Sequence, residues 1–308
     1  MEGIGYAAQH LNSKIHLNQK GATIESRNRI CPAPGTAIRR LANFPVTKKQ
    51  TADGYSHLDR NGRLEKISRY KKLFEQWQED NPDRGFQDYY GYVIEQHLDQ
   101  GHSHPTLGKN LIEGRVFGES GTGMLRRLIA LGLKQNHICV DYGCGSLRVG
   151  CHVIAHLNSG CYWGLDVNER FLRDGQDLIG RDIIRRKSPN LHLISDETLA
   201  QARTAGPRFI FSKSVLLHIH PNELAIYFDR ITRLMAKHTE AIIDATVCEQ
   251  TVQIEALSWA YSKTVLEDMI TSFGCSVRTL EEKTVQIEAT QHDGEIITML
   301  ISRNDKMP

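Results

Sequence analysis

The residues best suited to chemistry stand in one short stretch, in which Asp141 is followed closely by Gly143 and Gly145. The apolar residues 138–140 before them predict the end of a buried parallel strand. Glycines at the following turn permit backbone conformations that other residues avoid, so the chain can approach a ligand closely. Amides at the start of a helix predicted to run through His156 favour a polar or anionic group. The stretch therefore predicts a turn that binds a nucleotide-type ligand.

The kind of nucleotide depends on what surrounds these glycines. A dinucleotide fingerprint needs a third glycine, but Arg148 occupies that place and Gly150 comes two positions later. The lysine and hydroxyl residue of a phosphate-binding loop are also missing from this stretch. The carboxylate of Asp141 suits a ligand with an ammonium group and repels a pyrophosphate. These features disfavour an NAD oxidoreductase.

A second acidic residue follows the next predicted strand. The apolar run 162–165 ends in Asp166, 23 positions after Gly143. An acidic residue at the end of a second strand can accept hydrogen bonds from both ribose hydroxyls of a nucleotide. This spacing is shared with NAD enzymes, so Asp166 distinguishes the cofactors only together with Asp141 and the missing glycine.

Residues 140–146, Val-Asp-Tyr-Gly-Cys-Gly-Ser, resemble the first motif of class I S-adenosylmethionine-dependent methyltransferases. That motif runs hydrophobic, acidic, any residue, glycine, any residue, glycine, small. Further predicted strands follow in the family's order, near 190–196, 208–212, 241–245, 277–280 and 296–302. The resemblance covers roughly residues 111 to 303. It implies an α/β fold with a doubly wound, mainly parallel seven-stranded sheet, the Rossmann-like methyltransferase fold, and S-adenosylmethionine as the cofactor.

The resemblance also implies roles for six residues. Asp141 and the backbone at the two glycines would hold the amino-acid end of the cofactor, and Asp166 would hold the ribose. An acid at the end of the third strand would contact the adenine, and a serine ending the fourth strand is a further cofactor contact. The six residues are Asp141, Gly143, Gly145, Asp166, Asp196 and Ser212.

The candidate catalytic base is His218, which follows the fourth predicted strand on the side where ligands bind in open α/β sheets. Its near-neutral pKa suits proton removal. A hydroxyl acceptor needs a base far more than a thiolate or carboxylate does, so His218 favours an oxygen of a small-molecule acceptor. The alternative is that His218 only forms a wall of the site. The loop 212–215 lacks the Asp/Asn-Pro-Pro-Tyr/Phe sequence of enzymes that methylate DNA amines.

The chain divides into three parts. Residues 1–60 carry nine Lys and Arg against four Asp and Glu and form a basic segment that is flexible or orders on binding. Residues 61–105 are predicted to contain two amphipathic helices, broken at Pro82. The resemblance implies that these helices cap the substrate pocket or form a homodimer surface. The resemblance implies that residues 106–303 form the methyltransferase domain, which binds S-adenosylmethionine. The basic segment leaves open an RNA- or protein-directed methyltransferase, and a non-catalytic cofactor-binding protein is a further alternative.

The composition narrows the partners. The sequence has no apolar run of the length needed to cross a bilayer and no apolar N-terminal stretch typical of secretion, so we expect a cytoplasmic protein without membrane contact. Dense Arg/Lys clusters with interleaved aromatic residues are missing, which disfavours nucleic acid as a partner. The seven cysteines fit neither a zinc site nor a disulfide framework. His152 and His156 stand four apart without the glutamate of a metal motif, so no metal is expected.

Overall fold

The computed structural model describes residues 60–99, 119–287 and 293–304. The basic segment predicted for residues 1–60 lies outside the described residues except for Arg60, and residues 100–118 lie outside them as well.

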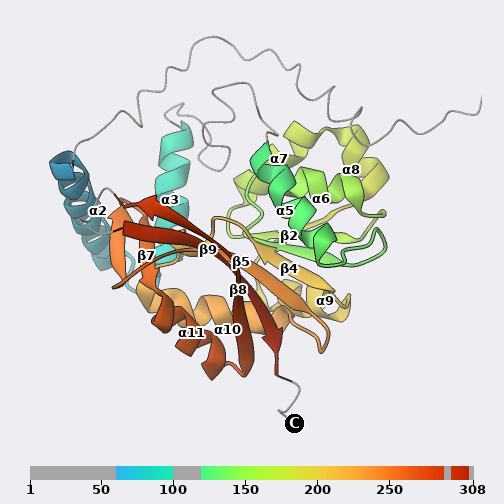
Figure 1. Ribbon diagram of the computed structural model, residues 1–308. Helices are drawn as coiled ribbons and strands as arrows, with labels where there is room; N and C mark the ends of the chain where they lie inside the picture. Colours follow the sequence, from blue (N-terminus) through green and yellow to red (C-terminus); the bar gives the residue numbers. More distant parts are fainter. Residues whose placement is uncertain (1–59, 100–118, 288–292, 305–308) are drawn as a thin grey trace, which may run out of the picture.

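Within the described part of the chain, nine strands form one sheet (Figure 1). The strands are β1 (Cys139–Tyr142), β2 (Tyr162–Asp166), β3 (Asn190–Leu193), β4 (Phe209–Ser212), β5 (Glu240–Cys248), β6 (Val252–Glu255), β7 (Ser258–Ser262), β8 (Cys275–Gln286) and β9 (Asp293–Arg303).

Seven of these strands have the predicted arrangement. β3, β2, β1, β4 and β5 lie side by side and parallel, β9 pairs antiparallel with β5, and β8 pairs antiparallel with β9. The predicted doubly wound, mainly parallel sheet is therefore confirmed. The sequence analysis missed β6 and β7, a hairpin whose second strand extends the sheet where Val247 pairs with Tyr261.

Helices cover both faces of the sheet (Figure 1). The helices are α5 (Glu119–Ala130), α6 (Gly150–His156), α7 (Glu169–Ile179), α8 (Arg181–Lys187), α9 (Asp196–Thr204), α10 (Leu224–Leu234) and α11 (Lys263–Ser272). Alternate strand residues enter different cores, since Val140 and Ile210 pack with α9, α10 and α11 while Cys139 and Phe209 pack with α5, α6 and α7. A sheet buried on both faces needs apolar strands, which explains the runs from which the strands were predicted.

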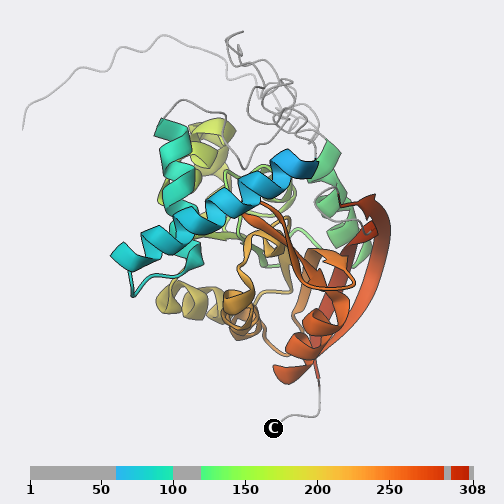
Figure 2. The same cartoon turned by 90° about the vertical axis from the view of Figure 1, so that its left-hand side faces the viewer.

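The two helices predicted before the first strand are present as α2 (Arg60–Asp80) and α3 (Phe86–Asp99). Phe86 and Tyr89 of α3 are buried in the same core as α10 and α11. Phe74 of α2 packs on both of these rings, with centroids 5.1 Å apart in each case. Figure 2 shows α2 lying across one side of the molecule next to α3. No helix among the described residues is long and apolar enough to span a membrane.

Candidate active site

A cavity lies at the carboxyl ends of the first four strands of the chain, β1 to β4. Each of these ends contributes to its wall: Gly143 follows β1, Asp166 ends β2, Ile194 follows β3 and Lys213 follows β4. The strand order reverses between β1 and β4, so the loops leaving these two strands diverge and leave a crevice between them. The cavity occupies the place where open α/β sheets bind their ligands.

The glycine turn after β1 has a backbone that only glycine adopts easily. Gly143 and Gly145 have φ angles of 78° and 53°, in the left-handed region. A Cβ atom at Gly143 would overlap the side chain of Val215, which follows β4, so the turn packs directly on the neighbouring loop. The amide of Gly145 donates a 2.7 Å hydrogen bond to Oδ2 of Asp166. The turn is therefore fixed to both strands that flank β1.

Asp141 forms part of the cavity wall from within β1 and is only 2% exposed. The hydroxyl of Tyr162 donates a 2.7 Å hydrogen bond to its Oδ2. Burial raises the pKa of Asp141 to about 8, although the bond from Tyr162 opposes this shift. A cationic group entering the cavity beside Asp141 would favour the ionised carboxylate.

Asp166 is also buried, and its carboxylate organises the backbone around it. Oδ1 accepts hydrogen bonds from the amides of Val167 and Asn168 at 2.8 and 3.1 Å, and Oδ2 accepts the bond from Gly145. Burial raises the pKa of Asp166 to about 6. The three hydrogen bonds from backbone amides limit this rise, because they favour the charged form. A carboxylate oxygen accepts about two hydrogen bonds, so Oδ2 retains capacity for a ligand hydroxyl.

His218 lines the same cavity from η1 (Leu216–His218), a short helix after β4. Its Nδ1 lies 2.8 Å from the carbonyl oxygen of Leu257, which can only accept a hydrogen bond, so Nδ1 carries the proton. Nε2 then carries the lone pair. Burial lowers the pKa of His218 below its usual value, although the bond to Leu257 opposes this shift, so burial favours the neutral ring. A neutral imidazole in this orientation is a competent proton acceptor.

Two predicted cofactor contacts lie outside the cavity lining. The carboxylate of Asp196 begins α9, is 86% exposed and forms a 2.7 Å ion pair with Arg233. Ile194 is the residue of this segment that faces the cavity. Ser212 ends β4 and is fully buried within the sheet. The structure thus brings together Asp141, Gly143, Gly145, Asp166 and His218, and separates Asp196 and Ser212 from them.

Helix α3 supplies the wall of the cavity next to His218. Gln87 and Tyr90 both line it, and the Tyr90 ring lies 5.1 Å from the His218 ring. The backbone amide of Gln87 donates a 3.1 Å hydrogen bond to Glu223, which lies in η2 (Pro221–Glu223). Oε1 of Gln87 accepts a 2.8 Å bond from Arg230. The beginning of α3 is therefore held by the segment that follows His218.

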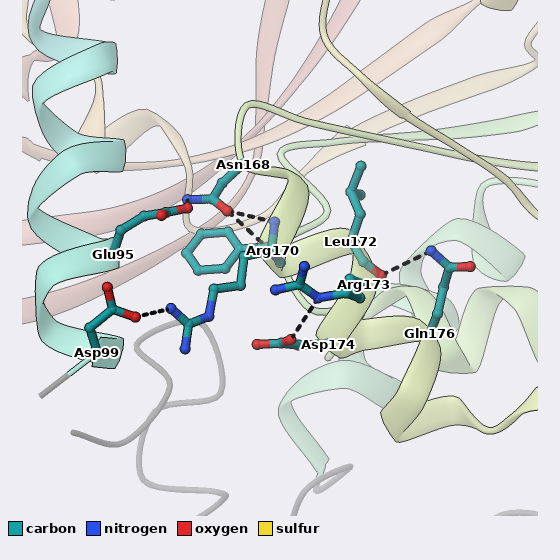
Figure 3. Close-up of polar contacts among 9 residues, drawn as sticks. Glu95, Asp99, Asn168, Arg170, Leu172, Arg173, Asp174 and Gln176 are labelled. Atoms are coloured by element: carbon teal, nitrogen blue, oxygen red, sulfur yellow. Dashed lines mark hydrogen bonds and ion pairs between the residues drawn. The ribbon is translucent and has the colours of Figure 1, made fainter. Parts of the chain in front are cut away.

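The C-terminal end of α3 is attached to the segment that follows β2 (Figure 3). Asp99 forms a 2.6 Å ion pair with Arg170, and the amide group of Asn168 donates a 3.3 Å hydrogen bond to Glu95. Asn168 also caps α7, because its Oδ1 accepts bonds from two backbone amides of that helix. Since Asn168 follows Asp166 by two positions, α3 bridges the segment after β2 and the segment after β4.

Charges elsewhere in the cavity wall are compensated. The ammonium group of Lys213 forms an ion pair with Asp244 of β5, whose other carboxylate oxygen accepts a 3.0 Å hydrogen bond from Thr298.

Within residues 60–99, 119–287 and 293–304, no three His, Cys, Asp or Glu side chains gather in a way that could hold a metal ion.

The sequence analysis did not identify Tyr162, Gln87 or Glu223 as site residues. Tyr162 could have been found from strand register: it pairs with Cys139, which lies two residues before Asp141 and therefore on the same face of the sheet. The contact between Gln87 and Glu223 joins residues 136 positions apart, and nothing in the local sequence marks it.

No protein-family model and no curated protein matches the sequence. Solved structures do match the fold. Magnesium protoporphyrin IX methyltransferase from Synechocystis PCC 6803 with bound SAM is 12% identical with a TM-score of 0.45, over 81% of this chain and 99% of that chain. A SAM-dependent methyltransferase from Anabaena variabilis is 10% identical with a TM-score of 0.49, over 72% and 96% of the two chains.

An arsenic(III) S-adenosylmethionine methyltransferase from Chlamydomonas reinhardtii is 16% identical with a TM-score of 0.46, over 57% of this chain and 66% of that chain. A shared fold does not fix a reaction, so the function has to come from the residues of the site.

Proposed function

We propose that this chain is an S-adenosylmethionine-dependent methyltransferase that methylates an oxygen atom of a small molecule. The observation that carries the proposal is a single cavity that is lined both by residues at the ends of β1 and β2 and by residues that follow β4. One end holds the glycine turn with the buried carboxyl groups of Asp141 and Asp166. The other end holds the neutral imidazole of His218. A cofactor end and an acceptor end within one cavity is what group transfer requires.

The residues of the glycine-turn end fit the parts of this cofactor. Asp141 would pair with its ammonium group, and the backbone of Gly143 and Gly145 would lie against its amino-acid end. The remaining lone pair on Oδ2 of Asp166 would accept a hydrogen bond from the ribose. Phe171 and Ile194 line the cavity on this side and would provide apolar contact for the adenine. When bound, the cofactor supplies an electrophilic methyl group on a sulfonium ion.

The protein's own contribution at the acceptor end is orientation and proton removal. Holding two reactants in line can contribute on the order of 7–11 kcal/mol to lowering a barrier. Nε2 of His218 would accept the proton of the acceptor hydroxyl, while the bond from Nδ1 to Leu257 keeps the ring in the required tautomer. A thiolate or carboxylate acceptor would not need this base, which is why we favour oxygen of a hydroxyl group.

The test is isothermal titration calorimetry with S-adenosylmethionine, S-adenosylhomocysteine and NAD, followed by methyl transfer from labelled cofactor into a small-molecule extract. We expect binding of the first two ligands and no binding of NAD. We also expect the label in a small product whose O-methyl group is stable to base. Binding of NAD alone would overturn the proposal. Cofactor binding without transfer to any extract would favour a non-catalytic binding protein.

The RNA- or protein-directed alternative has its own outcome in the same experiment. Label would then appear in macromolecules, and for RNA the binding would weaken strongly with salt and be lost when residues 1–60 are deleted.

A further inference from the structure

The acceptor end of the cavity differs in chemistry from the glycine-turn end. Its wall is formed by Gln87 and Tyr90 of α3 and by residues after β4, which are Lys213, Ser214, Val215, His218, Ile219 and Glu223. The rings of Tyr90 and His218 and the aliphatic side chains of Val215 and Ile219 provide apolar contact here. We propose, on the basis of the methyl transfer proposed above, that this end takes an uncharged aromatic ring bearing a hydroxyl group and a second oxygen substituent.

Charge compensation at this end argues for an uncharged acceptor. The ammonium of Lys213 is neutralised by Asp244, and the carboxylate of Glu223 interacts with the charge of Arg230. Arg148 lies at the other end, close enough to Asp141 to interact with its charge. A charged acceptor would therefore leave water without gaining a counter-ion beside His218, which is costly in a partly apolar site.

Ring shape and chemistry argue for an aromatic acceptor. The rings of Tyr90 and His218 contact each other, with centroids 5.1 Å apart and planes inclined by 38°, and both residues line the cavity, so a third ring can pack beside them. Acidity gives an independent reason. A phenolic hydroxyl has a pKa of about 10, roughly 3.5 above that of an imidazolium ion, whereas water-like hydroxyls lie near 16, roughly nine above it. His218 can therefore assist a phenol far more readily than an aliphatic alcohol.

Gln87 points to the second oxygen substituent. Arg230 is only a donor, so the atom of Gln87 that faces it at 2.8 Å must be the carbonyl oxygen. The amide nitrogen of Gln87 is then turned away from Arg230. Its two N–H groups can donate hydrogen bonds to an oxygen substituent of the substrate. In the transfer, the phenolic oxygen forms a bond to the methyl carbon, the carbon–sulfur bond breaks with its electron pair left on sulfur, and the proton passes to Nε2 of His218 and then to water.

The test measures binding before turnover. Catechol, cyclohexane-1,2-diol and benzoate are compared by saturation-transfer NMR on the full chain saturated with S-adenosylhomocysteine. The diol keeps both hydroxyls without the ring, and benzoate keeps the ring with a negative charge. We expect catechol to bind about ten-fold more tightly than either, because only catechol gains ring packing without burying a charge.

Two variants locate the binding. Tyr90→Ala is expected to weaken catechol binding about ten-fold through lost ring contact, and Gln87→Leu about three- to ten-fold through a lost hydrogen bond. Tyr92→Ala, on the exposed side of the same helix, is the matched control and should change nothing. Labelled methyl transfer to catechol should follow the same order.

The outcomes separate this inference from the proposed function. If S-adenosylhomocysteine binds but catechol does not, or if benzoate or the diol binds equally well, the aromatic-hydroxyl assignment is wrong and the methyltransferase proposal stands. Unchanged catechol binding in both Tyr90→Ala and Gln87→Leu would also overturn it. If S-adenosylhomocysteine itself does not bind, the proposed function fails.

Discussion

The hydroxyl of Tyr162 donates a 2.7 Å hydrogen bond to Oδ2 of Asp141, and both side chains are almost completely buried. The bond joins the first residue of β2 to β1 directly below the glycine turn. Burial raises the pKa of Asp141 to about 8, so this carboxyl group carries a proton near neutral pH until a cation enters the cavity. Cofactor binding and proton binding are therefore linked at Asp141.

The first prediction concerns this linkage. At pH 7 the carboxyl of Asp141 is mostly protonated in the free protein and becomes ionised against the cofactor ammonium, so binding should release close to one proton. Asp166, with a pKa of about 6, is already mostly ionised at pH 7 and contributes little. Proton release is measured by calorimetry in two buffers of different ionisation enthalpy. The Asp141→Asn variant should release none, and equal release in both proteins would refute the role of Asp141.

A second prediction concerns the ribose contact. Asp166→Ala removes a charge-assisted acceptor, a loss of about 1.5–3 kcal/mol, and should weaken cofactor binding roughly 10- to 100-fold. Part of that loss would come from the turn itself, since Gly145 loses its bond to Oδ2. Asp177→Asn, on the exposed side of α7, is the control for a change in surface charge. Unchanged affinity in Asp166→Ala would remove this residue from the site.

The glycine turn allows a third, structural prediction. Gly143→Ala places a methyl group against Val215 at a left-handed φ angle, and should lower the free energy of unfolding by about 1–3 kcal/mol and abolish measurable cofactor binding. Gly123→Ala, within α5 and with open space around its Cα, should be neutral or stabilising by up to about 1 kcal/mol. Denaturant unfolding of both variants checks the contrast. Equal destabilisation in the two would show that Gly143 has no special role.

Fourth, His218 should titrate below its usual range, because burial disfavours its charged form. A base with a lowered pKa stays active into mildly acidic solution, so kcat/KM should be flat near pH 7 and fall only below about 6.5. NMR of the labelled imidazole gives the pKa without knowledge of the acceptor. His218→Gln should reduce turnover by roughly 100- to 10,000-fold and leave cofactor affinity intact. Full turnover in this variant would mean that His218 is a wall residue.

The fifth prediction concerns the attachment of α3. Arg170→Ala breaks the ion pair with Asp99, and we expect faster amide hydrogen exchange in the last turn of α3 and faster release of S-adenosylhomocysteine. The matched control is Arg185→Ala, which removes another exposed ion pair, with Asp182 on α8. A release rate that is the same in the two variants would show that this end of α3 does not control access to the cavity.

Much of this fold could be predicted because its strands are short apolar runs punctuated by glycines and acids. Residues 138–145 and 162–166 carry both the hydrophobic pattern and the turn chemistry, so β1, β2 and the glycine turn followed from local sequence. The β6–β7 hairpin did not, because its two-residue connection, Ala256 and Leu257, has none of the Asn-Gly or Asp-Gly residues that mark tight hairpins.

The positions of candidate site residues could be predicted where these residues lie within strands. They were harder to predict where the residues lie in the loops that follow strands. Asp141 and Asp166 are fixed by strand geometry, and both line the cavity. Asp196 follows a strand by three residues and begins α9, where its exposed carboxylate forms an ion pair with Arg233 of the neighbouring α10. The contribution of α3 depends on contacts between residues far apart in the chain, such as Gln87 with Glu223.

The most direct test of the account is a crystal structure of the protein with S-adenosylhomocysteine. We expect the ligand in the cavity at the ends of β1 and β2, with its ammonium group beside Asp141 and its ribose within hydrogen-bonding distance of Asp166. Its sulfur should face the acceptor end of the cavity, which His218 lines. A ligand bound elsewhere, or one whose sulfur faces away from His218, would contradict it.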